Sequence, residues 1–238
     1  MVSAQHGPGA TEAHHEPAIE AGRHFCAIGD IHGEVALLDA LHARIIEDAR
    51  DAECDAVKVL IFVGDYVDRG PDSRAVVEMV ARSGLTGVET VHLKGNHEDM
   101  MPRFLDGDRD IGSLWLFNGG AETLESYGVT APSPSNIDGL AAARAKLARL
   151  LPASHLDFLR GLRRWYRDGD YLFVHAGVRA GVALDDQRDE DLMWIREGFL
   201  ERDHGLGGMV VHGHTPTVEP DLRAYRIGID TGAFFQAA

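Results

Sequence analysis

The chain has 238 residues, of which 45% are hydrophobic and 26% charged, and this composition is ordinary for a globular protein of one domain with a full core. Its formal net charge of −15 argues against DNA or RNA as a partner, because binding a phosphate backbone depends on Lys and Arg. With two cysteines, no apolar leader segment and no stretch of membrane-spanning length, the sequence predicts a cytoplasmic protein without a membrane partner.

The first segment, residues 1–22, mixes Gly, Pro, Ala, Glu and His without a period. Such a composition buries too little apolar surface to order a chain, so we expect a disordered tail. The rest, residues 23–238, is expected to form one domain.

From residue 23 onward, short β-rich runs alternate with segments of helical periodicity. Strands are predicted at 25–30, 57–65 and 88–96, each followed by a helix, and again at 171–177, 208–214 and 224–230. Alternation of this kind is typical of an α/β fold with a parallel or mixed sheet covered by helices.

The middle of the chain, about 106–165, is helical by composition, with a loop at 131–136 ("APSPSN"). We interpret it as a helical insertion beside the sheet and not as a separate domain. Its large aromatic residues are expected to form its core: Trp115, Phe117, Tyr127 and Trp165.

Five of the predicted strands end in Asp, Asn or His, the residue types that commonly bind metals in proteins. Because the carboxyl ends of strands in open α/β sheets converge on one crevice, these side chains should meet in space. Carboxylate, imidazole and amide groups without a thiolate suit hard or borderline divalent ions. One ion needs three or four protein ligands, so the larger set predicts two ions sharing an aspartate. The set comprises Asp30, His32, Asp65, Asn96, His97, His175, His212 and His214.

The same residues lie in a series of motifs: "GDIHG" (29–33), "GDYVDRG" (64–70), "GNHE" (95–98), "HAG" (175–177) and "GHT" (213–215). In this order they resemble the signature of the calcineurin-like metallophosphoesterases, specifically the bacterial-type serine/threonine phosphoprotein phosphatases. The resemblance extends to "DTGA" (230–233). It implies a β-sandwich flanked by helices, in four αββα layers, with a dinuclear metal site at the strand ends.

Position by position, the resemblance implies a first metal held by Asp30, His32 and Asp65. Asp65 would bridge to a second metal, whose other ligands would be Asn96, His175 and His214. The ions are expected to be Mn²⁺, with Fe or Zn as alternatives. Pro216 departs from the pattern of broader relatives, which have a further His there.

The remaining roles concern the phosphate and its leaving group. His97 resembles the general acid, oriented by Asp68. Arg69 resembles the phosphate clamp, helped by Asn96, and Arg196 is a second candidate clamp. Two divalent ions lower the pKa of a bridging water, so hydroxide would attack phosphorus while His97 protonates the leaving oxygen.

The predicted function is therefore metal-dependent hydrolysis of a phosphorylated protein or small phosphomonoester. One alternative is a dinucleoside polyphosphate hydrolase of the Ap4A type; some of these have "GDVQG" at the first motif, so His32 favours the phosphatase without excluding the others. A second alternative is a non-catalytic metal-binding relative, against which the intact ligand set and His97 argue. The natural substrate and the oligomeric state are left open by the sequence.

Overall fold

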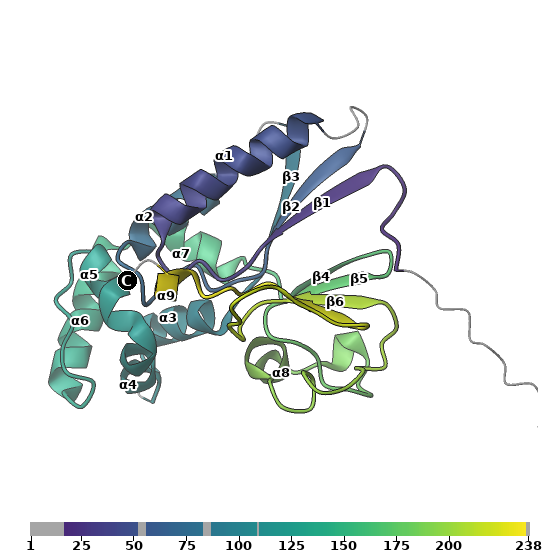
Figure 1. Cartoon of the computed structure of the whole chain (residues 1–238). Helices are drawn as coiled ribbons and strands as arrows, with labels where there is room; N and C mark the ends of the chain where they lie inside the picture. Colours follow the sequence, from purple (N-terminus) through teal and green to yellow (C-terminus); the bar gives the residue numbers. More distant parts are fainter. Residues whose placement is uncertain (1–16, 52–55, 83–86, 109, 237–238) are drawn as a thin grey trace, which may run out of the picture.

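The first half of the chain is a parallel β/α unit. The computed structural model describes residues 17–51, 56–82, 87–108 and 110–236. Its first sheet has the order β1-β2-β3, with all pairs parallel. The elements alternate as predicted (Figure 1): β1 (Arg23–Ile28), α1 (Val35–Asp51), β2 (Val57–Phe62), α2 (Ser73–Arg82), β3 (Val88–His92) and α3 (Asn96–Asp106).

The helical middle follows α3 directly. It consists of α4 (Ile111–Trp115), a π-helical turn η1 (Leu116–Gly120), α5 (Ala121–Ser126), α6 (Ile137–Leu150) and α7 (Ala153–Arg160). The predicted loop 131–136 separates α5 from α6, and Asn136 ends it as the N-cap, accepting a hydrogen bond from the Gly139 N–H at 3.0 Å.

The second half forms a mixed sheet with the order β4-β5-β6-β8-β7. The sequence did not predict two edge strands, β4 and β7. Each pairs antiparallel with the strand that follows it, because a short turn joins the two strands. The elements are β4 (Trp165–Asp168), β5 (Tyr171–Val174), the 3₁₀ turn η2 (Leu184–Asp186), α8 (Asp189–Trp194), β6 (Met209–His212), β7 (Asp221–Leu222), β8 (Arg226–Gly228) and α9 (Ala233–Gln236).

Strand β2 shows how the layers are built. Val59 and Ile61 pack with Phe173 and Val211 of the second sheet, forming the core between the sheets. Leu60 and Phe62, on the opposite face of β2, belong to the core beneath the helices. Side chains alternate between the faces of a strand, so this run is apolar throughout because it is covered on both sides.

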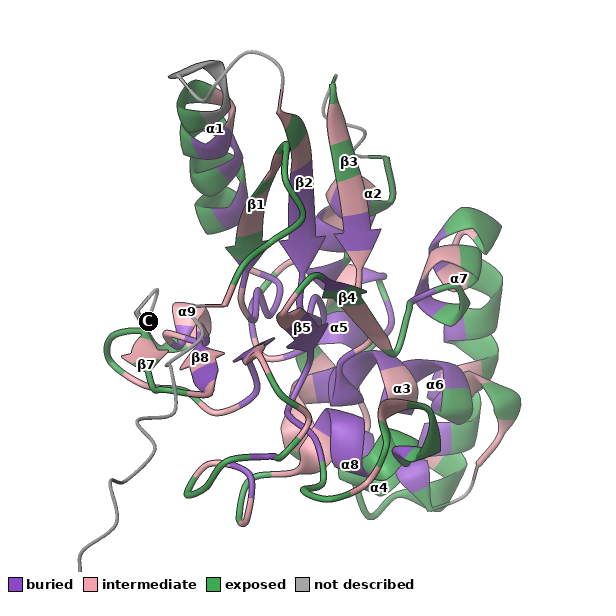
Figure 2. Cartoon of the chain, turned by 90° about the vertical axis from the view of Figure 1, so that its right-hand side faces the viewer, coloured by how far each residue is buried: buried purple, intermediate pink, exposed green. Residues whose placement is uncertain are grey.

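The outer side of the second sheet is covered by α8 and the loop after it, through Leu172, Val210, Leu192 and Phe199. The predicted four-layer sandwich is therefore confirmed. Figure 2 shows that burial increases along β2 towards its carboxyl end. None of the described helices is long and apolar enough to cross a membrane.

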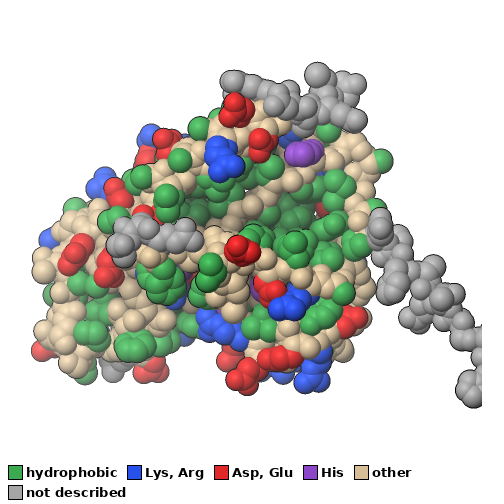
Figure 3. All heavy atoms as spheres, in the orientation of Figure 1, with side chains coloured by type: hydrophobic (Ala, Val, Ile, Leu, Met, Phe, Trp, Pro, Cys, Tyr) green, Lys and Arg blue, Asp and Glu red, His purple; other side chains and the backbone are tan. Residues whose placement is uncertain are grey.

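The sandwich opens beneath α1. Figure 3 shows hydrophobic side chains gathered in this hollow, a cavity of about 330 Å³ lined in part by Leu37, Leu41, Pro220 and Ile229. The floor of the cavity includes Asp30. The apolar face of α1 is thus only partly covered by the sheets.

The predicted N-terminal tail falls mainly in residues 1–16, outside the described residues. Its last part, 17–22, is described and contacts the turn between β4 and β5. There the backbone N–H groups of Ala18 and Glu20 donate to the carboxylates of Asp170 and Asp168 at 3.0 and 3.1 Å.

Candidate metal centre and active site

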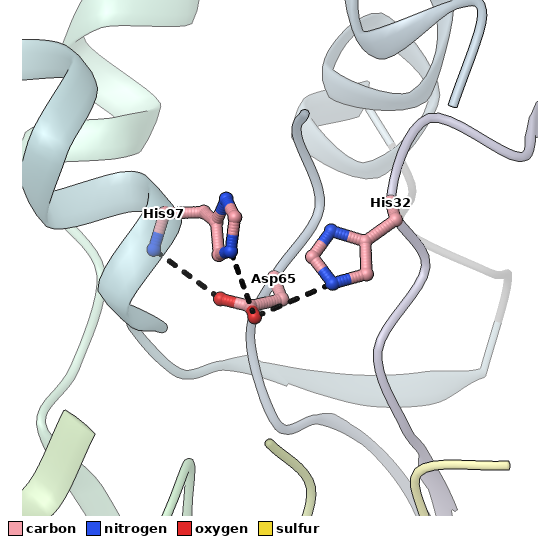
Figure 4. Close-up of side chains that lie close together, drawn as sticks. All are labelled: His32, Asp65 and His97. Carbon is pink, nitrogen blue, oxygen red and sulfur yellow. Dashed lines mark hydrogen bonds and ion pairs between the residues drawn. The ribbon is translucent and has the colours of Figure 1, made fainter. Parts of the chain in front are cut away.

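The loops after the strands bring most of the predicted ligands together. Two groups of buried side chains have donor atoms within 4.8 Å of one another: Asp65 with His32 and His97, and Asp65 with His175 and His214. Figure 4 shows the Asp65 carboxylate between the rings of His32 and His97. Asp65 is the one residue that belongs to both groups.

Each oxygen of Asp65 faces a different group. Its Oδ2 lies 3.5 Å from Nε2 of His32 and 3.7 Å from Nε2 of His97, and its Oδ1 lies 3.4 Å from Nε2 of His175. Asn96 Oδ1 lies 3.0 Å from the same nitrogen of His175. A shared carboxylate with one oxygen on each side is the arrangement that two neighbouring ions require.

The imidazoles present lone pairs to this centre. Nδ1 of His32 donates to the Val67 carbonyl at 2.9 Å, and Nδ1 of His175 donates to the Val63 carbonyl at 3.0 Å. Burial lowers the pKa of His175 to about 3 and that of His32 well below its usual value, so both rings are neutral. Their Nε2 atoms are then acceptors, and second hydrogen bonds to backbone carbonyls orient metal-binding histidines in this way.

The chemistry of the second group fits a cation. Nε2 of His175 faces Nδ1 of His214 at 3.2 Å, as well as the oxygens of Asn96 and Asp65. Oxygen and nitrogen atoms gathered at such distances are close enough to bind one cation together. The residues present could therefore hold a divalent ion.

Asp30 is placed differently from the other predicted ligands. It belongs to neither donor group of the described residues, and both its oxygens accept the His214 backbone N–H at 3.1 Å. Burial and the neighbouring Asp230 raise the pKa of Asp30 well above its usual range, and burial and Asp30 do the same for Asp65. Burial of neighbouring carboxylates is unfavourable, and a cation held between them would offset that cost, so these residues fit a metal ion.

The backbone is strained where these side chains are held. Within the described ranges, the non-glycine residues in the left-handed region are His32 (φ 47°), Asp65 (φ 52°), Asp68 (φ 72°), Arg69 (φ 68°) and His214 (φ 66°). This conformation is disfavoured for residues with a side chain and persists where tertiary contacts enforce it. All five are predicted site residues.

The predicted acid and its partner are in contact. Nδ1 of His97 lies 2.7 Å from Oδ2 of Asp68, and both side chains are fully buried. Nε2 of His97 is buried without a hydrogen-bond partner among the described residues and faces Asp65. An imidazole held at one nitrogen and free at the other is suited to proton transfer at the free atom.

Burial dominates the electrostatics of this pair. It raises the pKa of Asp68 to about 7, against the opposing hydrogen bonds from Thr123 and Trp115, and it lowers the pKa of His97 to about 3. Both shifts disfavour separated charges, so the two groups titrate as a coupled pair.

The two predicted phosphate clamps adjoin the centre from opposite sides. Arg69 Nη1 donates to Nε2 of His32 at 3.1 Å, and its guanidinium lies 5.1 Å from the ring centre of Phe234 in α9. Arg196 Nη2 donates to the backbone carbonyl of His214 at 3.1 Å. Both cations could therefore reach a phosphate bound near the histidines.

A family model described as calcineurin-like phosphoesterase matches residues 23–218, which include all the predicted metal ligands. The chain belongs to the calcineurin-like phosphoesterase family. It is an enzyme that hydrolyses phosphoester bonds, as the names of its relatives also indicate.

Two relatives span nearly the whole of this phosphoesterase. Serine/threonine-protein phosphatase 1 of Salmonella typhimurium is 31% identical over 219 residues, covering 90% of this chain and 88% of the relative. An asymmetrical bis(5′-nucleosyl)-tetraphosphatase of Geobacillus sp. is 31% identical over 229 residues, covering 89% and 86%. The relatives therefore fall into two substrate classes.

Solved structures support the fold alone, because their sequence identities are low. A provisionally named diadenosine tetraphosphatase has a TM-score of 0.55 at 21% identity, covering 92% of this chain and 88% of that one. A cold-active protein-tyrosine phosphatase of a Shewanella species has a TM-score of 0.50 at 17% identity, covering 91% and 75%.

The phosphoesterase also uses residues that the sequence analysis missed. Glu98 is fully buried, and its carboxylate accepts backbone N–H groups from Asp65, Tyr66 and Val67 at 2.8, 2.8 and 3.1 Å and from Gly95 at 3.1 Å. It thereby fixes the strained loop that carries Asp65. A Glu at the third position of a helix is the signature of a capping box, and "GNHE" contains that signal.

Trp115, Thr123 and Phe234 were also missed as site residues. Trp115 is buried core, as predicted, whereas the prediction for Phe117 was wrong, because its side chain is 83% exposed. The Trp115 Nε1–H also donates to both oxygens of Asp68 at 3.0 and 2.9 Å. Thr123 Oγ1 donates to Asp68 Oδ1 at 2.6 Å. Nothing in the spacing of Trp115 and Thr123 signals contact with a motif about fifty positions earlier.

Proposed function

We propose that this phosphoesterase is a dinuclear metal-dependent phosphatase that acts on serine or threonine phosphoproteins. One observation carries the proposal: the buried carboxylate of Asp65 directs one oxygen to each of two groups of neutral imidazoles. A cytoplasmic location stays a prediction from the cysteine content.

The ligands proposed for the first ion are Asp30, His32 and Asp65. Those proposed for the second are Asp65, Asn96, His175 and His214. Oxygen and imidazole donors without a thiolate favour Mn²⁺, with Fe or Zn as alternatives. When bound, the ions supply positive charge for the phosphate and lower the pKa of water at the site.

The chain's own residues then do the rest of the chemistry. Arg69 can grip two phosphate oxygens with its planar fork, and Arg196 can neutralise a further one. Hydrolysis breaks the bond between phosphorus and the ester oxygen, and that oxygen must take up a proton. Nε2 of His97 is placed to give it, while the carboxylate of Asp68 holds the ring at Nδ1.

A phosphopeptide is favoured by a cavity of about 710 Å³ beside the centre. Its wall includes Trp194, whose ring lies edge-on to His214 with the centroids 6.0 Å apart. A peptide flanking the phosphorylated residue could lie in this cavity, where the carboxylates of Asp99, Asp189 and Glu190 are paired with Arg103, Arg164 and Arg188. The charged residues lining it are Asp99, Asp110, Asp189 and Glu190 against Arg103.

The second candidate is a dinucleoside tetraphosphate hydrolase. Relatives that are 25% to 31% identical to this chain carry the name of such an enzyme, and the matches cover 83% to 86% of their length. The site would then have to bind four phosphates with the two predicted clamps, Arg69 and Arg196, which is the physical argument against it.

The test uses one purified sample, stripped with a chelator and reloaded with Mn²⁺. We expect two ions per chain by mass spectrometry and activity only after reloading. A phosphoserine peptide should give a higher kcat/KM than diadenosine tetraphosphate, with p-nitrophenyl phosphate as the generic substrate. Full activity in metal-free protein would refute the dinuclear mechanism, and a preference for the dinucleotide would establish the second candidate.

A further inference from the structure

The helical middle of the chain reaches into the reaction centre at Asp68. Both oxygens of this carboxylate are held: Thr123 donates to Oδ1 at 2.6 Å, and Trp115 Nε1 lies 3.0 and 2.9 Å from Oδ1 and Oδ2. His97 contacts Oδ2 at 2.7 Å. Asp68, Trp115, Thr123 and His97 are all completely buried, so water cannot replace any of these partners.

A chain of hydrogen bonds extends this network to α2. Thr123 has one hydroxyl proton, and it is donated to Asp68, which in its ionised form can only accept. Ser73 Oγ, 2.8 Å from Thr123 Oγ1, must therefore be the donor in that pair. The Asp68 backbone N–H lies 2.9 Å from both hydroxyl oxygens. The hydroxyls of α2 and α5 thus hold Asp68 at its backbone as well as at its side chain.

These contacts decide where the carboxylate points. The last torsion of an aspartate is broad, so a carboxylate without partners would turn freely and present either oxygen. Asp68 also has a left-handed backbone that would relax without support. Three donors from three different helices leave one orientation, in which Oδ2 meets His97.

The helical middle of the chain also contacts Arg69, the residue that follows Asp68. The Arg69 backbone N–H donates to the Gly119 carbonyl at 3.0 Å, within the π-helical turn η1. Gly119 has φ 99°, and a Cβ there would lie 2.7 Å from Arg69 Cγ. Only glycine allows this approach, and Gly119 marks a kink between the helices α4 and α5.

We propose that Trp115 and Thr123 are positioning residues, which hold Asp68 in the orientation that aims His97 at the leaving group. The helical region 106–165 is then part of the reaction centre in addition to covering the sheet. The inference rests on the function proposed above, because it assigns His97 as the proton donor.

The test compares Thr123→Val, which removes the hydroxyl at nearly constant shape, with Thr123→Ser, which keeps it. The loss of a buried hydrogen bond to a charged group predicts that Thr123→Val lowers kcat on a phosphoserine peptide by roughly 10-fold or more. The p-nitrophenyl phosphate reaction, whose leaving group departs without a proton, should change far less, and KM and metal content should not change. Thr123→Ser should restore kcat.

Tyr127→Phe is the matched control. It removes another buried hydroxyl of the same region, one that contacts His155 at 2.8 Å and lies outside the Asp68 network. It should leave the ratio of the two substrates unchanged. If Thr123→Val lowers both substrates equally, or lowers neither, the positioning role is wrong.

A double variant and a spectroscopic measurement complete the test. In a His97→Asn background, Thr123→Val should cause no further loss on the peptide, because both act through one proton. Independent of turnover, the side-chain NMR signals of His97 should show a hydrogen-bonded Nδ1 in the wild type and Thr123→Ser, and a changed one in Thr123→Val. An unchanged signal would overturn the inference. An inactive wild type with the expected NMR shift would instead refute only the proposed function.

Discussion

Replacing His97 with Asn should separate proton donation from metal binding. The Asn amide can still donate to Asp68 Oδ2, where His97 Nδ1 now lies at 2.7 Å, so the buried carboxylate keeps a partner. The proton at Nε2 is lost. Because none of the proposed ligands is changed, both ions should stay bound.

The size of the loss follows from the environment of Nε2. This atom has no hydrogen-bond partner among the described residues and faces Asp65 Oδ2 at 3.7 Å, so it contributes to the reaction more than to the fold. Removing a general acid lowers kcat by roughly 10²- to 10⁴-fold. That range corresponds to about 2.7–5.5 kcal/mol of transition-state stabilisation. It should appear with a phosphoserine peptide, whose alkoxide leaves badly without a proton, and be much smaller with p-nitrophenyl phosphate.

The assay is the ratio of variant to wild-type kcat on the two substrates, with metal content measured on the same samples. His92→Asn is the matched control, since His92 is an aromatic neighbour of Phe62 in the core and not of the site. Equal losses on both substrates with metals retained would refute proton donation by His97. Loss of metal would place His97 among the ligands, beside His32 and Asp65.

Three further predictions concern the metals and the clamp. Asp65→Asn should lower the metal content below two ions and reduce activity on both substrates more than any other ligand change, because both donor groups share this carboxylate; retention of two ions would contradict the bridging role. The pKa of Asp30 and Asp65 is raised by burial, so the metal-free protein holds protons that metals must displace. Metal affinity should therefore rise with pH. Calorimetry in buffers of different ionisation enthalpy should show that metal binding releases protons. A pH-independent affinity would show that these carboxylates are not ligands. Arg69→Lys should lower kcat/KM by roughly 10- to 100-fold on both substrates alike, since an ammonium cannot reproduce the fork, and an unchanged value would remove Arg69 from the phosphate site.

The sequence alone determined the layers and most residues of the centre. Apolar runs such as Val59–Val63 are long enough to be covered on both faces, and polar residues at their ends had to converge because parallel strands end at one edge. The short edge strands β4 and β7 escaped prediction because four and two residues carry too little pattern.

Tertiary structure decided how those residues are held and aimed. Glu98 secures the loop of Asp65 through backbone N–H groups, and Thr123 and Trp115 fix Asp68 from about fifty residues away. Such contacts have no period or motif of their own, because they depend on helices packed against the loops. The sequence names the groups that can do the chemistry; the packing of buried donors around strained backbone selects their orientation.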